Sequence, residues 1–239
     1  MLSIMKTLGL TFALAFTAFG PLHAGWQDEY ARLLKKYVTP NGVQYAAWKA
    51  NSEDVSAMNA VTDGFAAAPA STAKSKEQLA FYTNAYNAWI LHEALAKYPT
   101  KSVKDPLFIF FIGKRITVAG EKMSFSHLEK EIIRARFNEP RIHFALNCAS
   151  RSCPPLRNEP YAAASLDLQL EGQAKEFVNS PKGVTINKQG AALSKIFDWY
   201  KEDFGGEPGV IAFINQRRSS PLPAKISYQE YDWNLNETR

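Results

Sequence analysis

The stretch KEQLAFYTNAYNAWILHEALAK, from Lys76 to Lys97, carries the clearest helical pattern in this chain of 239 residues. Ser75 precedes it and Gln78 lies three positions later, which is the capping-box arrangement of a helix N-terminus. Pro99 predicts the end of the helix, because a proline does not continue its backbone hydrogen bonds. The bulky side chains recur at roughly helical spacing: Leu79, Tyr82, Tyr86, Trp89 and Ala94. We therefore expect one long, aromatic-rich and buried helix.

Two asparagines interrupt this helix on one face. Asn84 and Asn87 are three positions apart, so their side chains share that face. Asparagine is a poor helix former because its side chain competes with the backbone for hydrogen bonds, so a buried pair needs partners. Either the two amides bond the backbone of a neighbouring loop, or they help to line a binding site.

The residues that precede this helix in sequence are predicted to form an extension of the main domain. The soft segment Phe65 to Ser75 is a connection rich in alanine, serine and threonine. Residues 25–74 are too few to bury a core of their own, so we expect them to pack on a domain formed by residues 75–239. Within the extension we predict, in order, a helix Trp26–Tyr37, a turn at Pro40–Gly42 and a strand Val43–Trp48.

The C-terminal side mixes helices and strands without regular alternation. We predict a strand Leu107–Ile112, a hairpin Arg115–Met123, a helix to Phe137 capped at Ser126, a strand Arg141–Asn147, a helix Ser165–Asn179, a hairpin Val184–Leu193, helices Lys195–Phe204 and Pro208–Arg217, and a strand Ala224–Leu235. This order predicts a single α+β domain, with several helices packed on a small, mostly antiparallel sheet.

The first residues have the three parts of a secretory signal peptide. Lys6 gives a charged start, Thr7 to Gly20 an apolar middle, and Ala24 a small residue before a cut at Gly25. The apolar run is about 14 residues long, short of the roughly 20 that a membrane-spanning helix needs. We therefore predict that residues 1–24 are removed, that no membrane span remains, and that the protein is exported to the periplasm or secreted.

Charge and motifs narrow the function classes. The formal net charge of +5 is mildly basic and predicts no nucleic-acid partner. The chain has no glycine-rich phosphate loop, no G-x-S-x-G elbow and no H-E-x-x-H helix, and no paired spacing of zinc ligands, so we predict neither cofactor nor metal. Basic residues gather in one stretch, either as a solvated face or as a rim for an anionic ligand: Lys130, Arg134, Arg136, Arg141, Arg151 and Arg157.

The block RIHFALNCASRSCPPLR, Arg141 to Arg157, stands apart from the rest of the chain. A predicted strand that carries His143 leads into Cys148 and a polar loop that closes on Cys153. Functional groups are often held on such loops by a rigid scaffold. In an oxidising compartment the two nearby cysteines also favour a disulfide, which would close only a small loop.

These residues resemble the domain of unknown function 547 family. The resemblance rests on four segments: FYTNAYNA (Phe81–Ala88), LEKEIIR (Leu128–Arg134), PRIHFALNCASRSCPP (Pro140–Pro155) and IFDWYKEDF (Ile196–Phe204). It implies kinship of fold and brings no established activity with it. The family pattern includes the histidine of HFAL and the cysteine that follows, here His143 and Cys148, and does not require Cys153. Many relatives carry a histidine where this chain has Lys130.

One interpretation of the block is thiol catalysis. Cys148 is then the nucleophile and His143 the base that activates it, as in a thiol-dependent hydrolase or transferase. In this interpretation an acid or amide side chain orients the His143 base. Arg151 and backbone N–H groups of the loop hold an anion. The candidates for the orienting group are Glu129, Asp232, Asn84 and Asn87.

Two other interpretations involve no chemistry. In the first, the region binds an anionic or peptide-like ligand through Asn84, Asn87, Glu129, Arg141, Asn147, Ser150, Arg151 and Asp232. In the second, Cys148 and Cys153 form a structural disulfide, His143 is a satisfied buried histidine, and the asparagines bond backbone. In the IFDWYKEDF segment, Asp203 is expected to be solvated or paired with an arginine of the basic stretch.

Overall fold

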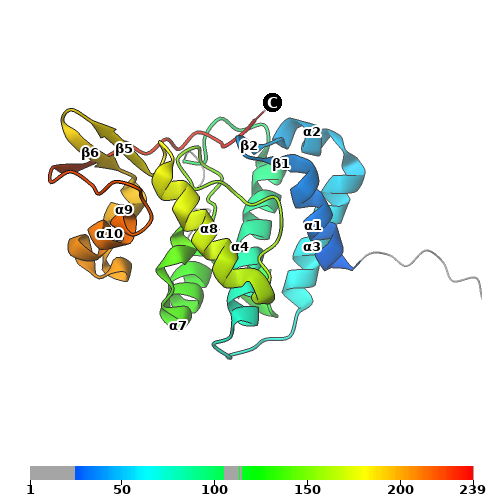
Figure 1. Cartoon of the computed structure of the whole chain (residues 1–239). Coiled ribbons are helices and arrows are strands. Elements are labelled where there is room, and N and C mark those ends of the chain that lie inside the picture. Colours follow the sequence, from blue (N-terminus) through cyan, green and yellow to red (C-terminus); the bar gives the residue numbers. More distant parts are fainter. Residues whose placement is uncertain (1–24, 105–112, 114, 239) are drawn as a thin grey trace, which may run out of the picture.

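A computed structural model describes residues 25–104, 113 and 115–238 of the chain. The predicted signal peptide and the predicted strand Leu107–Ile112 lie outside the described residues. Figure 1 shows a central helix flanked on one side by the N-terminal helices and on the other by a second group of helices and a hairpin. The elements form a single α+β domain, as the sequence predicts.

Helix α4 (Lys76–Lys97) forms the centre of the larger hydrophobic core. The Ser75 hydroxyl accepts a hydrogen bond from the Gln78 backbone N–H at 3.3 Å, which confirms the predicted cap. The helix ends before Pro99, as predicted. Buried residues occur on every face of this helix, so the helix is enclosed by the rest of the chain. No helix of the described part of the chain is long and apolar enough to cross a membrane.

The N-terminal segment packs against this core as α1 (Trp26–Tyr37), the hairpin β1 (Val38–Thr39) and β2 (Gly42–Val43), α2 (Tyr45–Ala50) and α3 (Ser52–Ala67). Helix α1 has the predicted bounds. The predicted strand Val43–Trp48 is wrong beyond Val43, because Tyr45 and Trp48, three positions apart, both reach the core from a helix. The division of the chain at residue 74 stays a prediction.

A buried carboxylate joins α1 to α3. Asp54 of α3 accepts hydrogen bonds from Arg32 (2.7 Å), Lys36 (2.6 Å) and Tyr37 (2.5 Å) of α1. Burial opposes the charge of Asp54, but these donors outweigh it and lower the pKa of the carboxyl to about 2. The ion pairs thus hold the two helices together at neutral pH.

The middle of the chain departs most from expectation. The predicted hairpin forms as β3 (Ile116–Val118) and β4 (Glu121–Met123), and a continuous helical segment follows: α6 (Phe125–His127), the π-helical η1 (Leu128–Arg134) and α7 (Ala135–Phe137). Its cap is Ser124 and not Ser126, since the Ser124 hydroxyl accepts from the His127 N–H at 3.0 Å.

The predicted strand Arg141–Asn147 is wrong. The chain instead forms a 3-10 helix, η2 (Pro140–Phe144), whose first turn accommodates Pro140. Glu139 caps it by accepting a hydrogen bond from the Arg141 backbone N–H at 3.0 Å. The side chain of His143 therefore projects from a helical turn and not from a strand, so it points in another direction than the predicted strand would give it.

A second hydrophobic cluster forms around Phe144, Phe177 and Phe197. The remaining elements of the chain follow η2 in order: η3 (Ala163–Ser165), α8 (Leu166–Asn179), β5 (Val184–Asn187), β6 (Gly190–Leu193), α9 (Lys195–Trp199), η4 (Lys201–Phe204), α10 (Gly206–Asn215) and β7 (Ile226–Tyr228). β5 and β6 pair antiparallel and β7 joins β6 in parallel. The strand pairs are thus mostly antiparallel, as predicted, but they form separate small sheets.

The C-terminal segment after β7 connects the two clusters. It runs in red along one edge of the molecule in Figure 1, from the β5–β6 hairpin to the β1–β2 hairpin. On its way the Asn234 carbonyl accepts from the Arg151 N–H at 2.8 Å, and the Asn236 carbonyl accepts from the Val43 N–H at 2.9 Å. This segment therefore closes the loop that carries the cysteines from one side.

Candidate functional site

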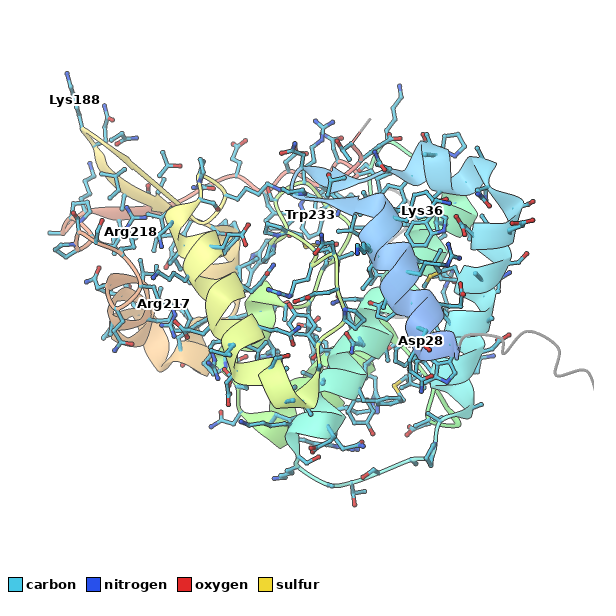
Figure 2. The ribbon with its side chains drawn as sticks, turned by 45° about the vertical axis from the view of Figure 1, so that its right-hand side comes forward. Asp28, Lys36, Lys188, Arg217, Arg218 and Trp233 are labelled. Carbon is cyan, nitrogen blue, oxygen red and sulfur yellow. A yellow bond between two sulfur atoms is a disulfide. The ribbon has the colours of Figure 1, made fainter. Side chains whose placement is uncertain are left out.

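A cavity of about 490 Å³ lies where the two hydrophobic clusters meet. Its walls are mainly aromatic: Tyr86, Trp199, Tyr200, Tyr231 and Trp233. In Figure 2, Trp233 lies between Lys36 on one side of the molecule and Arg218 on the other. The remaining wall includes Glu129, Lys130, His143 and both cysteines. Ring-lined hollows with a few polar groups are typical of small-molecule sites.

The two cysteines of the wall are bonded to each other. The Cys148–Cys153 disulfide confirms the pairing expected for two neighbouring cysteines, and Cys148 is not a free thiol. In this oxidised state Cys148 is not available as the nucleophile that the sequence predicts beside His143. The Cys148 N–H donates to the Cys153 sulfur at 2.9 Å, and the Tyr231 hydroxyl lies 3.3 Å from each sulfur. Ser150 Oγ lies 3.0 Å from the Cys148 sulfur.

Asn147 shapes the loop that carries the disulfide. Its side chain accepts from the Ala149 N–H at 2.8 Å and donates to the Pro154 carbonyl at 2.8 Å. Ala149 has a positive φ of 61°, which turns the chain sharply after Cys148. Asn147 is buried and its bonds are all within the protein, so its observed role is to fix the loop.

His143 bonds to an acid of the second cluster. Its Nε2 lies 2.7 Å from Asp203 Oδ2, and Arg134 donates to both Asp203 oxygens at 2.7 and 2.8 Å. Hydrogen bonds from His143 and then Arg134 hold the pKa of Asp203 well below its usual range. Because Asp203 is ionised, Nε2 carries the hydrogen and donates it. The ring stacks on Tyr200 with centroids 3.9 Å apart, which fixes its plane.

Glu129 enters the cavity from the π-helical segment η1. A π turn re-aims side chains relative to an α-helix and is frequent at functional sites. Glu129 Oε1 is buried and has no hydrogen-bond partner among the residues that the structure describes. Burial, and then the charge of the Glu129 carboxylate and a hydrogen bond to it, raises the pKa of the Tyr200 hydroxyl, so Tyr200 stays protonated as a donor beside the acid while Glu129 Oε1 itself has no partner in the described part of the chain.

Part of the cavity wall comes from the chain between α4 and α8, which is one continuous stretch of sequence. Residues 70–178 match the family model described as Protein of unknown function, DUF547. The match supports the resemblance expected from the sequence. The DUF547 segment contains Glu129, His143 and both cysteines, whereas Asp203 and Tyr231 lie outside it. No curated protein and no solved structure matched the chain.

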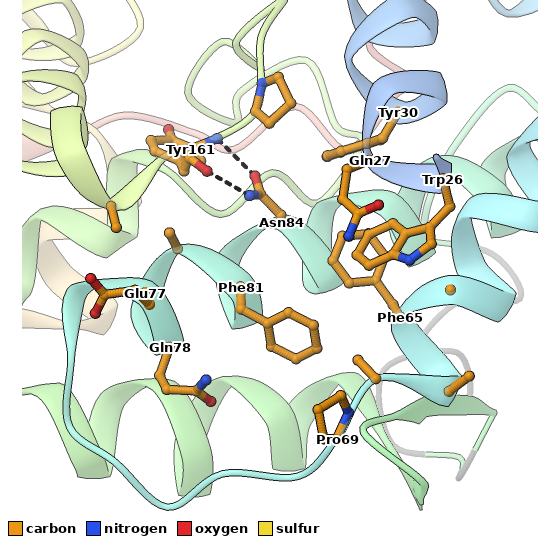
Figure 3. A pocket seen from close by; sticks show the side chains of 16 residues that line it. Trp26, Gln27, Tyr30, Phe65, Pro69, Glu77, Gln78, Phe81, Asn84 and Tyr161 are labelled. Atoms are coloured by element: carbon orange, nitrogen blue, oxygen red, sulfur yellow. Dashed lines mark hydrogen bonds between the residues drawn. The ribbon is translucent and has the colours of Figure 1, made fainter. Parts of the chain in front are cut away.

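Within the DUF547 segment, the two asparagines of α4 form hydrogen bonds with the backbone of neighbouring loops. Of the two roles expected for them, backbone bonding and lining a binding site, the structure shows the first. Asn84 accepts from the Tyr161 N–H at 2.9 Å and donates to the Tyr161 carbonyl at 2.8 Å. Figure 3 shows this pair at the edge of a second hollow, of about 760 Å³, beside Phe65, Phe81 and Trp26. Asn87 bonds the Ala145–Asn147 backbone in the same way.

Of the basic residues expected to form a rim, Lys130 lines the cavity, whereas Arg134, Arg141 and Arg157 are paired with acids. Arg141 is held by Glu139 at 2.6 Å and by Asp167 at 3.3 Å, and Arg157 pairs with Glu159. The hydrogen bonds that its guanidinium donates to Glu139 raise the pKa of Arg141 above its ordinary value. The charges of these arginines are therefore neutralised locally by ion pairs.

Two further residues predicted to belong to the site, Arg151 and Asp232, lie away from the cavity. Arg151 is exposed, and its backbone N–H bonds the C-terminal segment. Asp232 accepts from the Asn234 N–H at 2.9 Å and is thus a turn-forming side chain, and among the residues that the structure describes no histidine or arginine is bonded to it. Neither residue lines the aromatic cavity.

The sequence did not identify several residues of the site. Asp203 was expected only to be solvated or paired with a basic-stretch arginine; it pairs with Arg134 and also orients His143. Tyr231 and Trp233 lie in the segment predicted as a strand, with no local signal that they meet the cysteine loop. In the described ranges no group of histidine, cysteine, aspartate and glutamate side chains is arranged to hold a metal ion.

Proposed function

We propose that this domain binds a small ligand with a cationic amino group in the aromatic cavity. The observation that carries the proposal is Glu129 Oε1, a buried carboxylate oxygen without a hydrogen-bond partner in the described part of the chain. An unpaired buried acceptor costs about 1–3 kcal/mol, and more when charged. An ammonium donor in the cavity would remove that cost.

The aromatic walls suit the same ligand. Trp199, Tyr231 and Trp233 are in mutual contact, with ring centroids 4.5 to 5.7 Å apart. Ring faces attract cations, and the attraction grows to roughly 2 kcal/mol or more when the cation is desolvated. Trp199 is 47 % exposed, so its ring remains accessible from solvent.

The charges around the cavity favour a peptide-like ligand over a purely anionic one. Three of the arginines expected to attract an anion are paired with acids instead: Arg134, Arg141 and Arg157. Lys104 and Lys130 line the cavity and are exposed, so they suit a carboxylate at the outer end of the ligand. A small molecule with an amine and a carboxylate would match both ends.

The test compares benzylamine with benzyl alcohol, which has a similar shape and no charge. Tryptophan fluorescence and calorimetry of the full mature chain report binding. We expect benzylamine to bind more tightly and Glu129→Gln to weaken it about tenfold. Glu131→Gln, an exposed change on the same π-helical segment, is the matched control and should have no effect. Equal affinity for the two probes would refute the amine site.

A second candidate is the thiol-dependent hydrolase or transferase predicted from the sequence. The Asp203–His143 hydrogen bond favours it, since an acid that orients a histidine is the usual support of a catalytic base. It requires reduction of the disulfide. Iodoacetamide labelling of the reduced protein across pH tests it: Cys148 should react below the ordinary thiol pKa of about 8.5, and Asp203→Asn should remove that reactivity. Labelling like that of an unfolded thiol would contradict it.

We also propose that the protein is exported to the periplasm or secreted. The signal-peptide pattern of residues 1–24 supports this. The N-terminus of the protein isolated from its own cells tests the proposal by mass spectrometry. We expect it to begin at Gly25, and a chain that keeps residues 1–24 would contradict the cleavage.

A further inference from the structure

We propose that the Cys148–Cys153 disulfide is redox-active and exchanges with a small thiol that enters the aromatic cavity. The proposal rests on the same cavity as the proposed ligand site and adds a reaction to it. Both sulfurs belong to residues of the cavity wall.

The two sulfurs differ in access. Cys153 is only 4 % exposed, whereas Cys148 is half-buried. Thiol–disulfide exchange begins when a thiolate attacks one sulfur and the other leaves as a thiolate. Access therefore assigns Cys148 as the sulfur that is attacked and Cys153 as the leaving group.

The hydrogen bonds assign the same roles. The Cys148 N–H donates to the Cys153 sulfur at 2.9 Å. Ser150 donates to the Tyr231 oxygen at 3.0 Å, which directs the single Tyr231 hydrogen toward the sulfurs, 3.3 Å from Cys153. A neutral disulfide sulfur is a weak acceptor, whereas a thiolate is a strong one. The hydrogen bonds from these donors therefore become strongest when Cys153 leaves as a thiolate anion.

Tyr231 is suited to remain a donor during the reaction. Burial raises the pKa of its hydroxyl above the ordinary value, so the group keeps its hydrogen at neutral pH. Ser150 also lies 3.0 Å from the Cys148 sulfur, and its single hydrogen can turn from the Tyr231 oxygen to this sulfur when Cys148 becomes a thiolate in turn.

The exchange balances with two molecules of thiol. The first thiolate forms a sulfur–sulfur bond to Cys148 and breaks the bond to Cys153, which takes the electron pair. A second thiolate attacks the mixed disulfide, forms an external disulfide and releases the Cys148 thiolate. The two protons lost by the external thiols are taken up by the two cysteines. The external thiols are oxidised by two electrons and the protein disulfide is reduced by two.

The test follows reduction of the oxidised, full mature chain by β-mercaptoethanol, with rapid alkylation and mass spectrometry. The same chain unfolded in denaturant gives the rate of an unassisted disulfide. We expect faster reduction in the folded protein and a first mixed disulfide on Cys148. Tyr231→Phe should slow the folded reaction about tenfold. Tyr228→Phe is the matched control on β7 and should not change the rate, since that hydroxyl does not contact the sulfurs.

The outcomes separate this proposal from the amine site. Slower reduction in the folded than in the unfolded chain, or a mixed disulfide on Cys153, would overturn the redox proposal, whether or not benzylamine binds. Cysteamine carries an ammonium group in place of the β-mercaptoethanol hydroxyl. If cysteamine gains no advantage on folding while β-mercaptoethanol reacts quickly, the amine site fails and the redox proposal stands. A Ser150→Ala variant that also slows reduction supports the donor chain if Tyr231→Phe does not fold.

Discussion

Asn87, in the middle of α4, accepts a hydrogen bond from the backbone N–H of Asn147 across 2.9 Å. Its amide nitrogen donates to the Ala145 carbonyl, also at 2.9 Å. One buried side chain thus bonds the backbone on both sides of Leu146, immediately before Cys148. The central helix thereby sets the position of the disulfide loop, although 60 residues separate the two partners in sequence.

We expect Asn87→Ala to lower the free energy of unfolding by roughly 2–4 kcal/mol, because it leaves a buried N–H and a buried carbonyl unpaired. Urea unfolding of the oxidised protein measures this change. Asn234→Ala, an exposed asparagine of the C-terminal segment, is the matched control and should stay within about 0.5 kcal/mol of the wild type. An Asn87→Ala protein as stable as the control would show that the loop is positioned by other contacts.

Asp54→Asn should weaken the attachment of α1 to α3 at neutral pH. The pKa of Asp54 is about 2 in the folded protein, below the value of about 3.9 for an unfolded aspartate. The unfolded state therefore binds the proton first, and the stabilisation, about 2 kcal/mol, is present above pH ~4 and lost as the pH falls toward 2. Urea unfolding at pH 7 and at low pH measures it. The exposed change Asp63→Asn on α3 should leave the pH dependence intact.

Asp203→Asn should destabilise the protein at pH 7 by roughly 1–3 kcal/mol, because His143 and Arg134 lose a charged acceptor. The pKa of Asp203 is lowered on folding, so its stabilisation is present above the ordinary aspartate pKa and is lost as the pH falls below about 4. The variant should therefore approach the wild type in acid. Glu202→Gln, at an exposed neighbouring position, controls for the change of charge. A difference between variant and wild type that is the same at every pH would contradict the assignment.

Reduction of the Cys148–Cys153 bond should lower the free energy of unfolding by only roughly 2 kcal/mol, because the closed loop is short. Denaturant unfolding with and without reductant measures the change. The two hydrophobic clusters should keep the reduced protein folded, with its far-ultraviolet circular dichroism retained. Global unfolding on reduction would mean that the disulfide is needed for the fold itself.

The elements that the sequence predicted well have local signals. The bounds of α1 were predicted, and α4 carries its own serine cap and a proline beyond its end. The strands expected at Val43–Trp48 and Arg141–Asn147 failed because tertiary packing decided those segments. Tyr45 and Trp48 are buried from a helix, and Pro140 begins a 3-10 turn. Helix α3 was not foreseen, although Asn51 caps it by accepting from the Asp54 N–H at 3.0 Å.

The site was predictable only in part, for a similar reason. His143, Cys148 and Glu129 were named from the sequence and meet in one cavity. Their decisive partners lie far along the chain: Asp203 is 60 residues from His143, and Tyr231 is 83 residues from Cys148. No pattern of short spacing reports such contacts. The choice between thiol and disulfide also depended on the fold, which brings the two sulfurs together.

The C-terminal segment has a consequence for biosynthesis. Because Tyr231 and Trp233 form part of the cavity wall, the cavity does not exist in any shorter nascent chain. The helices α1, α3 and α4 and the cysteine loop are synthesised before this segment, so the loop is made before the residues that cover it. Cys148 and Cys153 thus spend part of their early life without the tyrosine hydroxyl beside them. A chain truncated before residue 231 would retain both cysteines and most of the hydrophobic core, yet present its sulfurs to whatever oxidant it first meets.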